Sequence, residues 1–146
     1  MPKTARTFTD LKPRIDETAV QHVLSLSLWQ PASAEAIARI VERCKSNNER
    51  KLWGIVDKEQ ICGIVEFYIR DDAVIYIANI AVIEERRGQG IGGLMLSMLQ
   101  KKFKLPIELE TDDDAVDFYR KCGFEAESFE KNGVRRWRCT LSVANL

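Results

Sequence analysis

A glycine-dense turn between an apolar strand and a helix is the feature that most constrains the fold of this chain. Four glycines, Gly88, Gly90, Gly92 and Gly93, fall within six positions. Residues 73–83 before them are rich in β-branched and aromatic side chains, and apolar residues at helical spacing follow them. The apolar run is too continuous for a strand with one solvent-exposed face, so it predicts a central strand covered on both faces.

The position of these glycines predicts an anion-binding site. The first backbone N–H groups of a helix have no partner inside the helix, and they lie at the positive end of its dipole. Glycine has no Cβ, so a ligand can approach the backbone closely and the chain can take positive φ. Residues 88–93 are therefore predicted to hold a phosphate or pyrophosphate group.

Two familiar phosphate-binding patterns fit poorly. The glycines are not followed by Lys-Ser or Lys-Thr, so the P-loop of nucleotide triphosphatases does not match. Residues 88–93 satisfy G-x-G-x-x-G, and Glu108 lies about where a ribose-binding acid would be. However, four charged residues separate the glycines from the strand, and fewer than 60 residues follow them. That length is too short for a dinucleotide-binding fold.

Three segments in fixed order match the pattern of a known family. The turn Arg87-Gly88-Gln89-Gly90-Ile91-Gly92 matches an Arg/Gln-x-x-Gly-x-Gly/Ala signature. Upstream lies Asn79-Ile80-Ala81-Val82, and downstream residues 115–124 match A-x-x-F-Y-x-x-x-G-F. Together the segments resemble the GNAT superfamily of acyl-CoA N-acyltransferases, in which the upstream segment is the fourth strand. The resemblance covers roughly the C-terminal half of the chain.

The composition indicates a single domain whose positive and negative charges balance. The 146 residues, 45% of them apolar and 30% charged, predict a single domain over residues 1–146. Lys and Arg together number 22, as do Asp and Glu, so we expect neither nucleic acid nor a membrane as partner. The polar N-terminus has no apolar segment of the kind found in signal peptides. A soluble cytoplasmic protein is the expectation.

Cysteine and histidine usage argues against a metal or disulfide framework. Cys44, Cys62, Cys122 and Cys139 are far apart in the sequence and form no C-x-x-C pair. This spacing indicates reduced, partly buried thiols. His22 is the single histidine, and it falls off the apolar stripe of its helix, so it is expected at the surface. No metal site is predicted.

Periodicity predicts the order strand, two helices, three antiparallel strands, helix, strand, helix and hairpin. The fold class is α/β (α+β): one GNAT-like mixed sheet with helices on both faces. The N-terminal part is expected to contain a short strand in residues 4–10, a helix capped by Asp16 and ended by Pro31 with Val20, Val23, Leu24 and Leu28 on one face, and a second helix capped by Ser33. Strands are expected at 51–56, 60–69 and 73–83, followed by a helix over about 90–104 and a strand at 105–110. The chain is then expected to form a helix opened by residues 112–114 and stopped by Gly123, and two strands at 124–130 and 134–141 around Asn132-Gly133.

Strand directions follow from the connections. The loops at 57–59 and 70–72 are short enough only for antiparallel hairpins, whereas the helix over 90–104 is a crossover that makes the next strand parallel. The GNAT resemblance implies that the fourth and fifth strands splay apart at their C-terminal ends and that acyl-CoA binds there. The pantetheine arm would then pair with the fourth strand as an added strand does. The residues expected to hold the cofactor are Ile80, Ala81, Val82, Arg87, Gly88, Gln89, Gly90, Ile91, Gly92 and Gly93.

The resemblance also implies catalytic roles. A backbone N–H near Val82 would stabilise the oxyanion, and Tyr119 would donate a proton to the sulfur of CoA. The spacing of Tyr119 beside Phe118 would equally suit a core residue, and Arg87 would equally suit a solvated turn. Cys122 lies one helical turn beyond Tyr119, and nothing near it in the sequence would form a thiolate, so covalent catalysis is disfavoured.

The sequence departs from the family at two positions. Asp112 stands where many members have an asparagine that contacts the cofactor, and a cap on the following helix suits an aspartate better. Tyr76 stands where relatives have a glutamate on the fourth strand, which leaves the general base unassigned. Glu108 and Glu110 share one face of the fifth strand and could activate the amine; deprotonation through water is the alternative.

The function expected from these residues is N-acetylation with acetyl-CoA as co-substrate. The acetyl group would move directly to a small-molecule or peptide amine in a ternary complex, with a homodimer left open. Trp29 and Trp137 would line an acceptor pocket or pack in the core. The alternative is a regulatory module of the same fold that binds acyl-CoA without turnover, and a dinucleotide oxidoreductase is a distant third.

Overall fold

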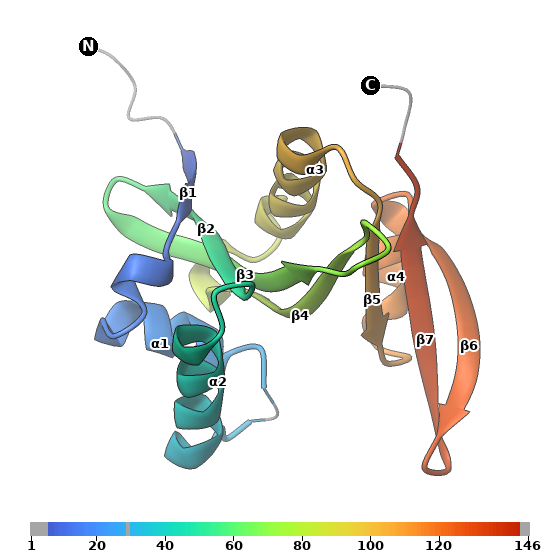
Figure 1. The fold of residues 1–146 in the computed structure, drawn as a ribbon, viewed down its shortest axis with the longest axis horizontal. Helices are drawn as coiled ribbons and strands as arrows, with labels where there is room; N and C mark the ends of the chain where they lie inside the picture. Colours follow the sequence, from blue (N-terminus) through green and yellow to red (C-terminus); the bar gives the residue numbers. More distant parts are fainter. Residues whose placement is uncertain (1–5, 29, 144–146) are drawn as a thin grey trace. The chain divides into compact units, whose positions relative to one another are not determined.

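The helices and strands follow one another in the predicted order (Figure 1). A computed structural model describes residues 6–28 and 30–143. The elements are β1 (Thr7–Asp10), a 3-10 turn η1 (Lys12–Arg14), α1 (Thr18–Ser25), α2 (Ala34–Ser46), β2 (Lys51–Asp57), β3 (Gln60–Ile69), β4 (Ile75–Val82), a 3-10 turn η2 (Glu84–Arg86), α3 (Ile91–Phe103), β5 (Ile107–Thr111), α4 (Val116–Lys121), β6 (Glu125–Lys131) and β7 (Val134–Leu141).

Hydrogen bonds order the strands β1-β2-β3-β4-β5-β7-β6, so β4 is a central strand as predicted. Residue contacts divide the chain into two compact units. The first unit comprises Met1–Tyr68 and Ala78–Met98, and the second comprises Ile69–Ile77 and Leu99–Leu146. Each unit has its own contacts and is described by itself. The expectation of one domain over residues 1–146 stays a prediction.

In the first unit, two apolar clusters cover opposite faces of the sheet. Helices α1 and α2 lie on one face, and the first turns of α3 lie on the other (Figure 1). Ile40, Val41 and Cys44 on α2 join the cluster on the α1 side, whereas Ile91 and Met95 on α3 form the other cluster with β2 and β3. Helices therefore cover both faces, as the apolar strands predicted.

Antiparallel pairing joins the first strands, as their short loops predicted. Strand β1 pairs antiparallel with β2, and β2 pairs antiparallel with β3 through the turn that joins Asp57 to Gln60. Strand β3 is buried from Ile61 to Phe67, because apolar clusters cover both of its faces.

A glycine on β3 lets α3 approach the sheet closely. A Cβ added to Gly63 would lie 2.9 Å from Met95 Cε and 3.2 Å from Ile91 Cγ2, both on the first turns of α3. It would also lie 3.1 Å from the carbonyl oxygen of Ala81 on β4. Gly63 therefore allows the close approach of α3 to β3, and a side chain here would require Met95 to change its conformation and Ile91 and the Ala81 carbonyl to shift slightly.

A buried carboxylate connects four segments of the first unit. Glu66 on β3 is fully buried and accepts hydrogen bonds from Asn79 Nδ2 at 2.7 Å and from Arg43 Nη2 at 3.0 Å. Its second oxygen lies 3.6 Å from Arg50 Nη1. Ser27, beyond the end of α1, donates to Asn79 Oδ1 at 3.2 Å. Because a buried charge is tolerated only when it is paired, this network ties α2 and the segment after α1 to β3 and β4.

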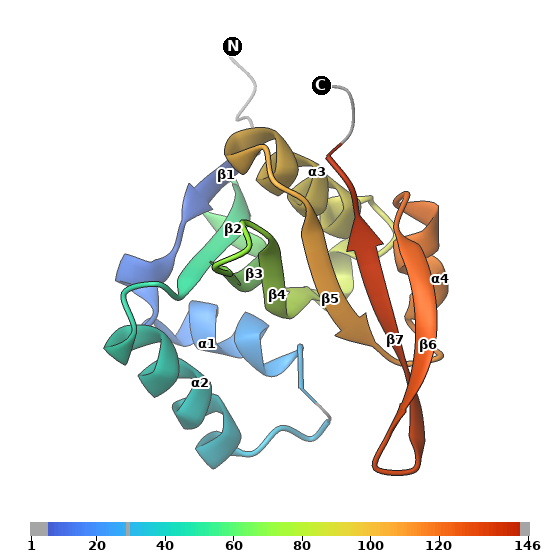
Figure 2. The same ribbon diagram turned by 45° about the vertical axis from the view of Figure 1, so that its right-hand side comes forward.

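In the second unit, β7 pairs antiparallel with both β5 and β6, and α4 packs against β6 and β7 (Figure 2). Burial alternates along β5: Ile107, Leu109 and Thr111 are buried, whereas Glu108 and Glu110 are half-buried. One face of β5 therefore belongs to the core and the other is partly open to solvent. Asn132 and Gly133 both have positive φ, as a type I′ hairpin turn requires.

Strands β4 and β5 are parallel, as the crossover helix predicted, but their pairing is short. The pairs are Ile75 with Ile107 and Tyr76 with Glu108. The ladder therefore ends well before β4 ends at Val82. This short ladder agrees with the predicted splaying of these two strands.

Three predictions about the N-terminal region need correction. Helix α1 ends at Ser25, not at Pro31, and Leu28 packs against the core from outside the helix. Asp16 does not cap α1; it forms an ion pair with Lys45, and the capping position is Glu17 without a side-chain bond. The first strand is shorter than residues 4–10, whose first two positions lie outside the described residues. Ser33 does cap α2, accepting from the Ala36 N–H at 3.0 Å.

None of the helices in the described residues is long and apolar enough to cross a bilayer.

Replacing Glu66 by Gln should lower the free energy of unfolding by about 3 kcal/mol, because Arg43 and Arg50 lose their buried counter-charge. Urea unfolding followed by circular dichroism measures the change. The control is Glu127→Gln, the same substitution at an exposed strand position, which should change stability by less than about 0.5 kcal/mol. Equal stability of Glu66→Gln and the wild type would show that the arginines do not depend on this carboxylate.

Candidate functional site

The glycine turn adopts the conformation that its sequence requires. Gly88 and Gly90 have φ of 82° and 79°, values that side chains with a Cβ rarely adopt. A Cβ added at either position would meet no atom within 4 Å, so open space lies beside the backbone. Helix α3 begins directly after this turn, at Ile91. The glycines are thus needed for the backbone path and not for close packing within the protein.

The N–H groups of residues 88–93 have no hydrogen-bond acceptor among the described residues. The first helical bond runs from the N–H of Leu94 to the carbonyl of Gly90, at 2.9 Å. Gly88, Gln89 and Gly90 are exposed. A run of unpaired N–H groups at a helix start can hold a phosphate or another anion; that residues 88–93 do so remains a prediction.

Arg87 lies beside this turn and bonds to the backbone. Its Nε donates to the carbonyl oxygen of Val82 at 3.2 Å, and its side chain is exposed. The guanidinium therefore has further donors that can reach an anion. The prediction that Arg87 contacts phosphate remains untested; the structure adds that this arginine fixes the turn to the end of β4.

The end of β4 presents backbone groups away from β3. The N–H of Ile83 donates to Cys62 on β3 at 2.9 Å, and the carbonyl of Ala81 also lies toward β3, near Gly63. Because backbone groups alternate in direction along a strand, those of Ile80 and Val82 point away from β3. Val82 can therefore offer an N–H to a ligand, as an oxyanion donor must.

Tyr119 on α4 is a buried phenol. It is 6% exposed and packs edge-to-face against Phe118 and Phe124, with ring centroids 5.0 and 5.6 Å away. Its hydroxyl has no hydrogen-bond partner among the described residues. Burial raises the pKa of Tyr119 well above its usual value, and negative charge at Cys139, Cys122 and Asp112 would add to the effect. The hydroxyl therefore stays protonated and remains a donor over the whole physiological range.

Asp112 and Cys122 flank α4, and the contacts and burial of these residues indicate structural roles. Asp112 Oδ1 accepts from the N–H of Ala115 at 2.9 Å, so this aspartate holds the turn that precedes α4; the capping position of the helix is Ala115, without a side-chain bond, and the predicted cap by Asp112 is wrong. Burial raises the pKa of the Cys122 thiol, which makes a nucleophilic thiolate less available. All four cysteines are free. No group of three or more potential metal-ligating acids, histidines or cysteines lies together in residues 6–28 and 30–143.

The two glutamates of β5 differ sharply in their partners. Glu108 forms a two-point ion pair with Arg70, whose Nη1 and Nη2 lie 2.7 and 3.3 Å from its oxygens. Arg70 also holds Asp72. Glu110 instead has a longer ion pair, 3.7 Å, with Lys131. The structure therefore separates two residues that the sequence treated as equivalent.

Comparison with known proteins identifies the family. A model described as the acetyltransferase (GNAT) family matches residues 17–124, well over half of the chain. The chain belongs to the GNAT family. No curated protein matches it.

Solved GNAT structures share its fold. An aminoglycoside 6'-N-acetyltransferase complexed with coenzyme A superposes with a TM-score of 0.78 at 16% identity, over 96% of this chain and 98% of that one. A GNAT acetyltransferase from Elizabethkingia anophelis with acetyl-CoA bound gives 0.69 at 20%, covering 96% and 99%. The ribosomal-protein-S18-alanine N-acetyltransferase of Escherichia coli gives 0.69 at 16%, covering 97% and 96%. At these identities the likeness supports the GNAT fold alone.

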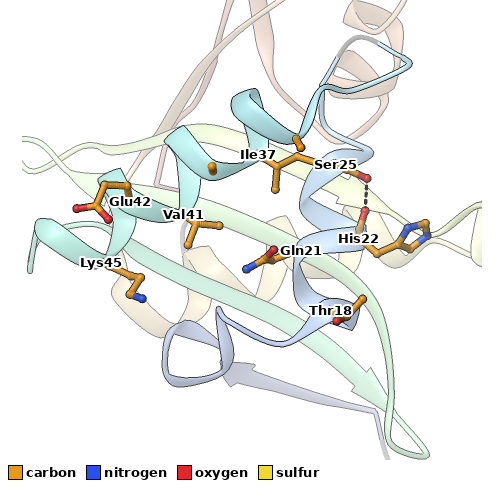
Figure 3. Close-up of a pocket in the computed structure, with 10 residues that line it drawn as sticks. Thr18, Gln21, His22, Ser25, Ile37, Val41, Glu42 and Lys45 are labelled. Atoms are coloured by element: carbon orange, nitrogen blue, oxygen red, sulfur yellow. Dashed lines mark hydrogen bonds between the residues drawn. The ribbon is translucent and has the colours of Figure 1, made fainter.

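A pocket of about 570 Å³ between α1 and α2 was not predicted from the sequence (Figure 3). Ile37 and Val41 form its apolar part, and His22 and Glu42 lie at its border. None of the GNAT motif residues lines it. The exposed position of His22 agrees with the prediction. The one sequence signal for this pocket is the pair of small residues Ala34 and Ala38, which leave space between the two helices.

Of the two tryptophans that the sequence suggested for an acceptor pocket, the structure describes one, Trp137. Trp137 is half-buried, and its Nε1 donates to Asp113 Oδ1 at 2.7 Å, while Arg135 forms a two-point ion pair with the same carboxylate. Arg120 stacks on the Trp137 ring at 4.7 Å. Trp137 thus connects β7 to the loop before α4 and to α4 itself. Trp29 lies outside the described residues.

Tyr119 should not ionise before the other tyrosines. A difference titration of tyrosinate absorbance between the wild type and Tyr119→Phe should show no signal up to about pH 10, the usual phenol pKa, because burial raises the pKa of Tyr119 above that value. Intact folding at each pH is verified by circular dichroism. A difference signal already at about pH 9 would mean that water reaches the phenol freely.

Proposed function

We propose that this GNAT chain is an N-acetyltransferase that transfers the acetyl group of acetyl-CoA directly to a primary amine. The observation that carries the proposal is the unpaired run of N–H groups at residues 88–93, which starts at the exposed residues Gly88, Gln89 and Gly90. A pyrophosphate is the CoA group whose charge and size suit such a run. The solved GNAT structures that contain CoA or acetyl-CoA support the choice of co-substrate.

Each half of acetyl-CoA has a proposed place on the chain. Residues 88–93, with Arg87 beside them, hold the pyrophosphate. The outward backbone groups of Ile80 and Val82, with Ala81 between them, pair with the pantetheine arm as a neighbouring strand would. Arg87 then releases the Val82 carbonyl, because the ligand supplies a donor in its place. The proposed binding residues are Ile80, Ala81, Val82, Arg87, Gly88, Gln89, Gly90, Ile91, Gly92 and Gly93.

Acetyl transfer needs stabilisation of two developing charges. The N–H of Val82 donates to the oxyanion of the tetrahedral intermediate. Tyr119 donates a hydrogen bond to the departing thiolate of CoA. Because its pKa is raised and a thiol has a pKa of about 8.5, complete proton transfer would be uphill. Tyr119 therefore acts mainly by donating a strong hydrogen bond, and the proton that neutralises the thiolate comes ultimately from the amine.

The acceptor is proposed to be a small molecule or a peptide. The solved GNAT relatives include enzymes named for an aminoglycoside and for an alanine of ribosomal protein S18. Neither name identifies the acceptor of this chain. A cytoplasmic location and a homodimer are part of the same proposal, and light scattering with and without CoA measures the oligomeric state.

The central experiment measures CoA release from acetyl-CoA with a panel of primary amines. Release above the amine-free rate, together with mass-spectrometric detection of the acetylated amine, supports the transferase. Calorimetric binding of acetyl-CoA without turnover of any amine would instead favour a regulatory acyl-CoA-binding module. Absence of acetyl-CoA binding would overturn both functions.

Tyr119→Phe should lower kcat by about tenfold to a hundredfold, which corresponds to the loss of one strong hydrogen bond to a developing charge. The Kd for acetyl-CoA should change little, because the bond forms mainly as the thiolate departs. Steady-state kinetics and calorimetry provide the two values. Tyr68→Phe, the same substitution on β3, is the matched control and should retain turnover. Unchanged kcat in Tyr119→Phe would remove Tyr119 from the mechanism.

Gly90→Val should weaken acetyl-CoA binding by at least about tenfold, because a β-branched residue resists positive φ and its side chain would occupy the space beside the N–H groups. Calorimetry measures the Kd. Gly133→Val strains a similar conformation in the β6–β7 turn, so it controls for stability alone. Equal acetyl-CoA affinity in all three proteins would argue against this pyrophosphate site.

A further inference from the structure

Asn79 on β4 is a half-buried residue whose amide is held at both ends. Its Nδ2 donates to Glu66 Oε1 on β3 at 2.7 Å, and its Oδ1 accepts from Ser27 Oγ at 3.2 Å. A carboxylate that is paired with arginines accepts hydrogen bonds and does not donate them, so the amide nitrogen has to face Glu66. These contacts therefore allow one orientation of the Asn79 side chain.

The bond from Asn79 to Glu66 is the stronger of the two. Its acceptor is charged and fully buried, whereas the single proton of Ser27 is shared between Asn79 and the carbonyl oxygen of Leu24, at 2.7 Å. Glu66 is itself held in place, because two arginines lie 3.0 and 3.6 Å from its oxygens. Asn79 is thus attached to a fixed point on the α1–α2 side of the sheet.

The last part of β4 alternates between the two faces of the sheet. Ala81 and Ile83 belong to the apolar cluster on the α1–α2 side. Ile80 and Val82 pack against the cluster on the α3 side. Asn79 is two residues before Ala81, so it shares the face that α1 and α2 cover. Of the three side chains on this face, only that of Asn79 has polar atoms.

This difference affects the rotation of β4 about its own axis. Apolar contacts are non-directional, so Ala81 and Ile83 hold the strand against the helices but permit small rotations. Hydrogen bonds weaken steeply when donor and acceptor lose their alignment, so the bonds of Asn79 resist rotation. The same rotation decides where the outward backbone groups of Ile80 and Val82 point. These are the groups proposed to pair with the pantetheine arm of acetyl-CoA.

The proposed pyrophosphate site has a different support. Ile91 and Met95, on the first turns of α3, pack in the apolar cluster on the other face of the sheet and hold residues 88–93. Asn79 has no hydrogen bond to any of these described residues. A change at Asn79 should therefore affect one half of the cofactor and not the other.

We propose that Asn79 is a positioning residue that fixes the rotation of β4 through Glu66 and thereby sets the affinity for the pantetheine arm. The proposal rests on the proposed transferase function, because it takes acetyl-CoA as the ligand of β4. It goes further in separating the recognition of the two halves of the cofactor. The pantetheine arm depends on the bond between Asn79 and Glu66, whereas the pyrophosphate does not.

The first experiment compares CoA with ADP, which contains the adenosine and the pyrophosphate but lacks the pantetheine arm. Asn79→Ala should weaken CoA binding about tenfold, as expected when two backbone hydrogen bonds are lost, and should change the Kd for ADP less than about twofold. Calorimetry measures the Kd for CoA, and NMR chemical-shift titration measures that for ADP. Asn48→Ala, the same substitution at an exposed position between α2 and β2, is the control and should leave both values unchanged.

A second pair of variants tests the proposal even if Asn79→Ala folds poorly. Asn79→Asp places two carboxylates in contact and removes the bond, so CoA binding should weaken by about tenfold or more. Adding Glu66→Gln exchanges donor and acceptor, because the amide at position 66 then donates to the carboxylate at position 79. The network again contains one carboxylate, and the Kd for CoA should return to within about threefold of the wild type. A role in stability alone predicts equal Kd values for the single and the double variant.

Equal changes in the Kd values for CoA and ADP in Asn79→Ala, including no change in either, would overturn the proposal. So would a double variant that binds CoA no better than Asn79→Asp, or a wild type that binds CoA no more tightly than ADP. Wild-type protein that binds CoA but not ADP would overturn the pyrophosphate site, on which this proposal also rests. Absence of binding of both ligands overturns the proposed function itself.

Discussion

The close approach of α3 to β3 is the constraint on which the candidate cofactor site depends. Gly63 has no side chain, so Ile91 and Met95 can pack directly against the strand. That contact fixes the first turn of α3, and with it the direction in which the N–H groups of residues 88–93 point. An anion site built from backbone needs such support, because each N–H contributes only if it is already aimed at the ligand.

Polar contacts fix the opposite face of the first unit. Glu66 would be costly to bury alone, yet two arginines and Asn79 make it the point at which four segments meet. Asn79 directly precedes the stretch of β4 whose backbone points outward. The network therefore holds the strand from one side while α3 packs on the other, so an extended ligand would meet a backbone that is already ordered.

The sequence predicted what depends on neighbouring residues and missed what depends on distant ones. Glycine spacing, the Ser33 cap and the Asn132-Gly133 turn each have local causes, and all three agree with the structure. The predicted end of α1 was wrong because a proline such as Pro31 only sets the last position that a helix could reach, and α1 stops earlier, at Ser25. Likewise, no local pattern could reveal that Arg70 occupies Glu108 but leaves Glu110, or that Asp113 binds Trp137.

Strand β6 ends the hydrogen-bonded order of the sheet, so one of its edges has no neighbouring strand within residues 6–28 and 30–143. Its sequence places Glu125, Glu127 and Glu130 along that edge. If further copies of the chain added there, strand upon strand, the ionised side chains of Glu125, Glu127 and Glu130 would have to lose part of their hydration at each new ladder. The acidic side chains therefore make open-ended growth through β6 costly.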